Sequence, residues 1–151
     1  MQELLKHIAT LGPVGYIPYA PGTFGTLAAF SCILLFPFPP VAHLLFIIFC
    51  IIIGSIAATT AEKEFAQKDS RRIVVDEFVG YYVATFYIPN SIPLMIASFL
   101  LFRFFDIIKP LMIRKLESTL SSGLGVMADD ILAGVYANLV LQAYLMIGSR
   151  G

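Results

Sequence analysis

Two pairs of adjacent acidic residues stand in apolar surroundings, and each pair is followed by a glycine. They are Asp76, Glu77 and Gly80 in "IVVDEFVG" (73–80), and Asp129, Asp130 and Gly134 in "MADDILAG" (127–134). Adjacent helical residues point about 100° apart. One carboxylate of each pair can therefore face a neighbouring helix, while the other braces it or reaches a second ion. The glycines would let the helices approach closely.

Four carboxylates gathered in one place repel one another unless protons or cations neutralise them. Oxygen-only ligands suit Mg²⁺, Mn²⁺ or Ca²⁺. The chain has only two histidines, His7 and His43, and they lie far from both pairs, so a histidine zinc site is not expected. A purely structural alternative is that the acids are buried and neutralised by basic residues, of which the candidates are Arg103, Lys109 and Arg72.

A third motif, "LFRFFDIIKP" (101–110), combines cations with an acid. Arg103, Asp106 and Lys109 stand at i, i+3 and i+6, which predicts one broad helical face. Such a face could hold a phosphate and a metal together, because the arginine fork matches a phosphate group. The alternative is an interfacial salt bridge accompanied by a lysine that extends toward water.

The stretch "YAPGTFGT" (19–26) predicts a turn followed by a helix start. Pro21 and Gly22 interrupt the chain, and Thr23 is a favourable N-cap residue. Free N–H groups at a helix start suit an anion, which makes Gly22 and Thr23 candidates for phosphate binding. The motif lacks the lysine of a nucleotide-binding P-loop. An ordinary cap where a helix enters a membrane explains it equally well.

Composition indicates what kind of protein carries these motifs. Hydrophobic residues make up 58% of the 151 residues and charged residues 13%, against about 25% charged in soluble domains. The sequence therefore predicts an all-α, polytopic membrane helical bundle that forms a single domain over residues 1–151. A net charge of zero gives no indication of nucleic-acid binding. About five membrane-embedded helices are expected, at 24–36, 41–61, 73–89, 91–108 and 126–147, after a short N-terminal interfacial helix.

The connections between these segments differ in charge. Residues 62–72 and 103–117 are rich in basic side chains, namely Lys63, Lys68, Arg71 and Arg72 in the first and Arg103, Lys109, Arg114 and Lys115 in the second, whereas 37–40 and 88–93 hold no charge. Positive residues favour the cytoplasmic side. The N-terminus and both basic connections are thus predicted inside, and every motif above falls at the cytoplasmic end of its helix. The acids then form one layer near that face.

Together the motifs resemble the phosphatidylglycerophosphatase A family of bacterial membrane lipid phosphatases. The matching stretches are "GYIPYAPGTFGTLAA", "RRIVVDEFVGYYVA", "LFRFFDIIKP" and "GLGVMADDILAG", in the family's order. The family pattern often has prolines where this chain has Ser70 and Met112, both in connections. The resemblance implies an inner-membrane enzyme that uses Mg²⁺ to hydrolyse phosphatidylglycerophosphate to phosphatidylglycerol and inorganic phosphate. It implies functional roles for Thr23, Asp76, Glu77, Arg103, Asp106, Lys109, Asp129 and Asp130.

This resemblance leaves some alternatives open. Any of the five acids could be the general base, and an aspartyl-phosphate intermediate competes with direct attack by water, which we favour. A phosphatase acting on another lipid phosphate is the main alternative function, because no motif in the sequence indicates recognition of the glycerol group. A cation- or proton-coupled transporter is disfavoured, since the acids lie at one end of the helices and no inverted repeat is present. The spaced aspartate pattern of cytidine-diphosphate lipid transferases is absent.

Overall fold

The computed structural model describes residues 1–68, 70–109 and 123–148, and every regular element among them is a helix. Arg114 and Lys115, in the later part of the second basic connection, lie outside these residues. In chain order the elements are α1 (Gln2–Ala9), the 3₁₀ turn η1 (Val14–Tyr16), α2 (Pro21–Leu35), α3 (Pro40–Phe65), α4 (Val75–Ala84), α5 (Ile92–Ile108) and α7 (Gly123–Gly148). The all-α prediction is confirmed for the described residues.

Two of these helices, α3 and α7, are long and apolar enough to cross a membrane, with 26 residues each. At 1.5 Å per residue each is about 39 Å long, which exceeds a hydrocarbon core of about 30 Å. The other apolar helices are shorter, with 15 residues in α2 and 17 in α5. Prolines stand in the first turns of α2, α3 and α5, where the missing N–H costs nothing.

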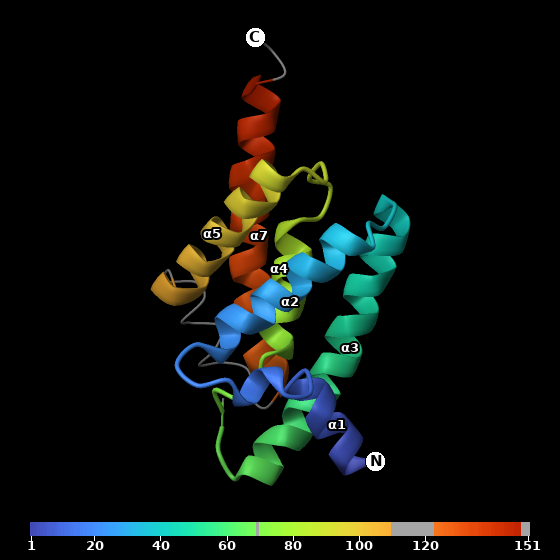
Figure 1. Cartoon of the computed structure of the whole chain (residues 1–151), viewed down its shortest axis with the longest axis vertical. Helices are drawn as coiled ribbons and strands as arrows, with labels where there is room; N and C mark the ends of the chain where they lie inside the picture. The colour runs from blue at the N-terminus through green and yellow to red at the C-terminus, as the bar shows by residue number, and fades with distance from the viewer. Residues whose placement is uncertain (69, 110–122, 149–151) are drawn as a thin grey trace.

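Helix α4 lies at the centre of the bundle and packs most extensively against α7, while α2 crosses in front of it (Figure 1). Gly134 of α7 faces the backbone of Gly80 in α4, and a Cβ on Gly134 would overlap the Gly80 carbonyl oxygen. A Cβ on Gly80 would in turn lie 2.7 Å from the Asp130 carbonyl oxygen. The prediction that these two glycines permit close helix approach is confirmed.

Helix α4 ends earlier than the sequence suggested. The apolar run predicted a helix over 73–89, whereas the helix stops at Ala84 and residues 85–91 are irregular. Two side chains of α7 donate hydrogen bonds to carbonyl oxygens at the end of the helix and just after it. Asn138 Nδ2 donates to the carbonyl oxygens of Ala84 and Phe86 at 3.1 and 2.6 Å, and Gln142 Nε2 lies 3.3 Å from the Tyr87 carbonyl oxygen. These donors make the early end tolerable in apolar surroundings.

The N-terminal helix α1 packs against the end of α3. Leu5 and Ile8 contact the buried cluster around α3 and α4, whereas Leu4 is exposed. Lys6 Nζ lies 2.9 Å from Glu64 of α3 and 3.0 Å from Glu3, and the hydrogen bonds to these carboxylates raise the pKa of Lys6. Part of the apolar face that we expected to lie on a membrane is therefore used to dock α1 on the bundle.

Candidate active site

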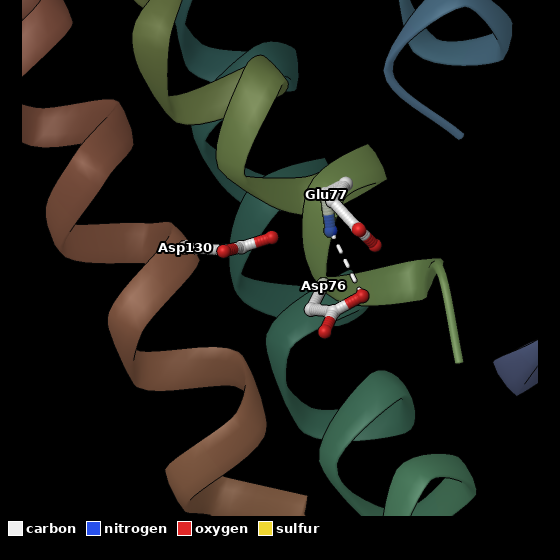
Figure 2. A group of neighbouring side chains, drawn as sticks. All are labelled: Asp76, Glu77 and Asp130. Atoms are coloured by element: carbon white, nitrogen blue, oxygen red, sulfur yellow. Dashed lines mark hydrogen bonds between the residues drawn. The ribbon is translucent and has the colours of Figure 1, made fainter. Parts of the chain in front are cut away.

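Three carboxylates from two helices meet at one end of the bundle. Asp76 and Glu77 stand in the first turn of α4, and Asp130 reaches toward them from α7 (Figure 2). One oxygen of each lies within 4.8 Å of the others. Asp76 and Asp130 are buried and Glu77 is half-buried. The predicted convergence of the two acidic pairs is therefore confirmed for these three residues.

The sequence around Asp76 explains why a charged residue points inward. Val74, Val75 and Val79 are buried and fix the rotation of α4. Just before α4, Val74 N donates a backbone hydrogen bond of 2.9 Å to Ala9 O, which attaches the start of α4 to the end of α1. With the valines inward, Asp76 faces α7 and Glu77 faces α2. Asp76 Oδ1 accepts a hydrogen bond of 3.0 Å from the Glu77 N–H, which orients its carboxylate.

The second acidic pair divides its two members between different partners. Asp130 joins the group above, whereas Asp129 forms an ion pair of 2.5 Å with Lys109. Asp129 Oδ1 also accepts the Asp130 N–H at 3.1 Å, which repeats the arrangement of Asp76 and Glu77. Asp129, predicted as a metal ligand, is thus not among the three clustered carboxylates.

Arg103, Asp106 and Lys109 do not share one helical face. Helix α5 ends at Ile108, and Lys109 is its C-cap with a left-handed φ of 45°. That conformation directs Lys109 to Asp129 on α7. Arg103 and Asp106 remain on the helix as an ion pair, with Nη1 2.6 Å from Oδ2. The stripe prediction is wrong for Lys109 because the helix ends one residue before it.

The Arg103–Asp106 pair lies beside the three carboxylates. Asp106 interacts electrostatically with both Glu77 and Asp130, and Arg103 interacts with Glu77. The ion pair lacks hydrogen-bond geometry, and Arg103 Nη1 is buried without a hydrogen-bond acceptor among the described residues. Arg103 therefore retains donor capacity that a phosphate oxygen could use.

The first turn of α2 closes the other side of the group. A Cβ on Gly22 would overlap Glu77 Oε1, so the Glu77 carboxylate lies directly against this turn. Thr23 is not the N-cap that we predicted. Ala20 occupies that position and the helix begins at Pro21, which places Thr23 within the first turn. The first intrahelical donor is Phe24 N, bonded to Ala20 O at 3.3 Å. The N–H groups of Gly22 and Thr23 precede it, as at any helix start.

The three carboxylates fit a divalent cation by their own chemistry. Glu77 Oε2 and Asp130 Oδ2 are buried and lack a hydrogen-bond partner among the described residues. Unpaired buried carboxylate oxygens are costly, and a cation bound between them removes that cost. The donor set contains oxygen alone, which matches Mg²⁺, Mn²⁺ or Ca²⁺.

The structural alternative, neutralisation by basic side chains, holds for only part of the acidic layer. Lys109 pairs with Asp129 and Arg103 with Asp106, while the Arg72 guanidinium lies over the rings of Tyr16 and Phe65, at 5.6 and 5.3 Å from their centroids. Within the described residues no salt bridge reaches Asp76, Glu77 or Asp130. These three acids are therefore the ones that no basic side chain neutralises among the described residues.

The sequence analysis missed one feature of this region. Arg71 was treated only as a marker of the cytoplasmic side, and Arg72 also as a possible partner of the buried acids, yet both line a pocket beside the start of α2. Tyr16 and Tyr19, which precede Pro21, were the sequence signal for this pocket, since the Arg72 guanidinium lies over the Tyr16 ring.

Comparison with known proteins identifies a family and several relatives. The sequence model of the family described as Phosphatidylglycerophosphatase A matches residues 7–145. A Haemophilus influenzae protein named "Phosphatidylglycerophosphatase A" is 38% identical, with 92% of this chain and 93% of the relative covered. An Escherichia coli protein of the same name is 35% identical, with 84% and 75% covered.

A third relative has a different name. The "Putative phosphatidylinositol-3-phosphatase" of Bacteroides thetaiotaomicron is 39% identical, with 84% of each chain covered. No solved structure matches the chain. The family match spans all the clustered carboxylates, the start of α2 and the Arg103–Asp106 pair, and the chain belongs to the phosphatidylglycerophosphatase A family.

Proposed function

We propose that this chain hydrolyses the phosphomonoester of phosphatidylglycerophosphate to give phosphatidylglycerol and inorganic phosphate. The observation that carries the proposal is the group formed by Asp76, Glu77 and Asp130, whose oxygens lie within 4.8 Å of one another. Family membership and two relatives named for this activity support the choice of reaction and substrate.

Asp76, Glu77 and Asp130 would hold Mg²⁺. When bound, the ion would neutralise phosphate charge and lower the pKa of water. Residues around the group would act on the substrate. The N–H groups of Gly22 and Thr23 would receive phosphate oxygens, because a helix start carries partial positive charge. Arg103 would stabilise the charge that spreads over the equatorial oxygens during transfer.

The reaction we favour is direct attack by water on phosphorus. The bond between phosphorus and the bridging glycerol oxygen breaks, and this oxygen leaves with the proton that a carboxylate of the site has accepted from the attacking water. A carboxylate of the group accepts the proton lost by the attacking water. Asp106 is well placed to assist, since it interacts with both Glu77 and Asp130. The Lys109–Asp129 pair would fix the end of α5 against α7 and thereby position Asp130.

The site would face the cytoplasm, with the helices around it embedded in the inner membrane. The basic residues of the connection after α3 support this orientation, because positive residues are retained inside. Two helices long enough to span, together with the shorter apolar helix α2, support the embedding. The acyl chains of the substrate would then remain among the helices while its headgroup reaches the carboxylates.

A second substrate class is favoured by one comparison. The Bacteroides relative named "Putative phosphatidylinositol-3-phosphatase" matches 84% of this chain at 39% identity. Both lipids carry a phosphomonoester on a polyol that is joined to diacylglycerol through a phosphodiester. The same three carboxylates could serve either one.

A substrate panel tests the function directly. Purified protein would be supplied with phosphatidylglycerophosphate, phosphatidylinositol 3-phosphate and phosphatidic acid in neutral detergent, with Mg²⁺ or with excess chelator. We expect phosphate release to be fastest from phosphatidylglycerophosphate and to require Mg²⁺. Faster release from the inositol lipid would establish the second candidate. Release from none of the three lipids would show that the chain is not a lipid phosphatase of this kind.

A further inference from the structure

A pocket containing two arginines opens beside the carboxylate group. It has a volume of about 270 Å³, and its walls include Tyr16, Tyr19, Pro21, Arg71 and Arg72. No acidic residue lines it among the described residues. Both arginines are exposed, and neither lies within 4.0 Å of a carboxylate in the part of the chain that the structure describes. The pocket therefore carries two positive charges that are open to an anion from outside.

The arginines are held by a packed frame. A Cβ on Gly15 would overlap the Arg72 carbonyl oxygen, so the loop before α2 is seated on the segment that leads into α4. The Arg72 guanidinium lies 5.6 Å from the Tyr16 ring centroid and 5.3 Å from that of Phe65. Rings against the face of a guanidinium leave the N–H groups at its edge free to donate. Arg72 is thus oriented before any ligand arrives.

The first turn of α2 lies between the pocket and the three carboxylates. Pro21 lines the pocket, and the next residue, Gly22, lies against the Glu77 carboxylate. The same turn therefore borders both sites. An anion in the pocket would lie next to any phosphate bound at the carboxylates.

We propose that Arg71 and Arg72 form a binding site for a second phosphate group, distinct from the one that is hydrolysed. The proposal rests on the function proposed above. Two sources supply such a group. One is the phosphodiester that joins the headgroup of the substrate to diacylglycerol, and the other is inorganic phosphate released by the reaction. Planar guanidinium groups match phosphate oxygens in either case.

Binding of inorganic phosphate can be measured without catalysis. In excess chelator the three carboxylates disfavour phosphate at the site of hydrolysis, so any phosphate binding that is lost when both arginines are replaced reports Arg71 and Arg72. Thermal unfolding of the wild type and of the Arg71→Gln/Arg72→Gln double variant would be followed as phosphate is added. The control is Lys63→Gln, which removes one charge from a separate pocket near α1. We expect the double variant to bind phosphate about tenfold more weakly or worse, since each lost bond involves charged partners.

Kinetics then identify the source. With Mg²⁺, the ratio of kcat/KM for phosphatidylglycerophosphate to that for phosphatidic acid, which has no phosphodiester, would be compared across the variants. If the lipid phosphodiester occupies the pocket, the double variant lowers this ratio about tenfold through KM. If released phosphate occupies it, the ratio stays constant and product inhibition weakens.

The proposal is wrong if the double variant matches Lys63→Gln in phosphate binding, in substrate ratio and in product inhibition. Arg71→Gln alone serves as a second variant, because Arg71 makes no ring contact that the fold would lose. A wild type that binds phosphate in chelator yet hydrolyses no lipid would overturn the proposed function and leave the phosphate site intact.

Discussion

The carboxylate of Glu77 lies directly against Gly22, so that the start of α4 contacts the start of α2 with no space for a side chain at position 22. Any side chain at position 22 would occupy the place of Glu77 Oε1. This relationship makes the glycine part of the site, although it has no functional group.

Gly22→Ala should therefore reduce activity while leaving the fold intact. The overlapping atom is the far end of a flexible side chain, so Glu77 would turn away and the helices would stay in place. A displacement of about 1 Å in a catalytic group can cost about 100-fold. Turnover and thermal unfolding would be measured together, with Gly148→Ala as the control, since nothing lies within 4 Å of a Cβ there. Unchanged turnover in Gly22→Ala would mean that Glu77 has no role in the reaction.

Asp76→Asn and Asp130→Asn should each abolish most activity and leave stability unchanged or higher. Each change keeps the shape of the side chain and removes one of the clustered charges, and a buried amide costs less than an unpaired charge. We expect turnover to fall by several orders of magnitude. Glu3→Gln on the exposed face of α1 is the matched control. Turnover within threefold of the wild type would show that these acids have only a structural role.

Mg²⁺ should stabilise the folded protein through the same residues. A ligand that binds only the folded state raises its stability in proportion to the logarithm of ligand concentration. We expect the unfolding temperature of the wild type to rise with added Mg²⁺ and to fall on chelation, and we expect Asp130→Asn to lose this response. An equal response in both proteins would place the Mg²⁺ site elsewhere.

Gly134→Ala should destabilise the protein where Gly22→Ala does not. The added methyl group would meet the carbonyl of Gly80, which is backbone and cannot rotate away. Overpacking of this kind costs about 1–3 kcal/mol. Denaturant unfolding of the two alanine variants in the same detergent would compare them. A Gly134→Ala variant as stable as the wild type would contradict the close approach of α4 and α7.

The sequence was sufficient to predict an all-helical chain, the approximate positions of α2, α3, α5 and α7, and the convergence of three of the acids. Hydropathy placed α3 and α7, and the two acidic pairs indicated the meeting of Asp76, Glu77 and Asp130. It could not separate Asp129 from Asp130, because neighbouring helical residues differ only by a rotation that packing decides. Asp129 pairs with Lys109, whose direction follows from a left-handed C-cap conformation that the residue type does not indicate.

The early end of α4 was hidden for a similar reason. Apolar residues continue through position 89, so hydropathy extends the helix. Asn138 and Gln142, about fifty residues later, donate to carbonyl oxygens of Ala84, Phe86 and Tyr87, at the helix end and just beyond it. A hydropathy pattern describes neighbouring residues, so it cannot reveal a hydrogen bond between segments that are distant in the sequence.

Gly80 and Gly134 each follow a clustered aspartate by four residues, Asp76 and Asp130 respectively, which is about one helical turn. The contact between their backbones therefore determines how far apart the two aspartates are held one turn away. Mg²⁺ requires oxygens at about 2.0–2.1 Å, whereas Ca²⁺ accepts about 2.3–2.6 Å. If a cation binds at this group, its selection by ionic radius would thus depend on two residues that have no side chain, and exchanging one carboxylate for another would leave the spacing of the helices unchanged.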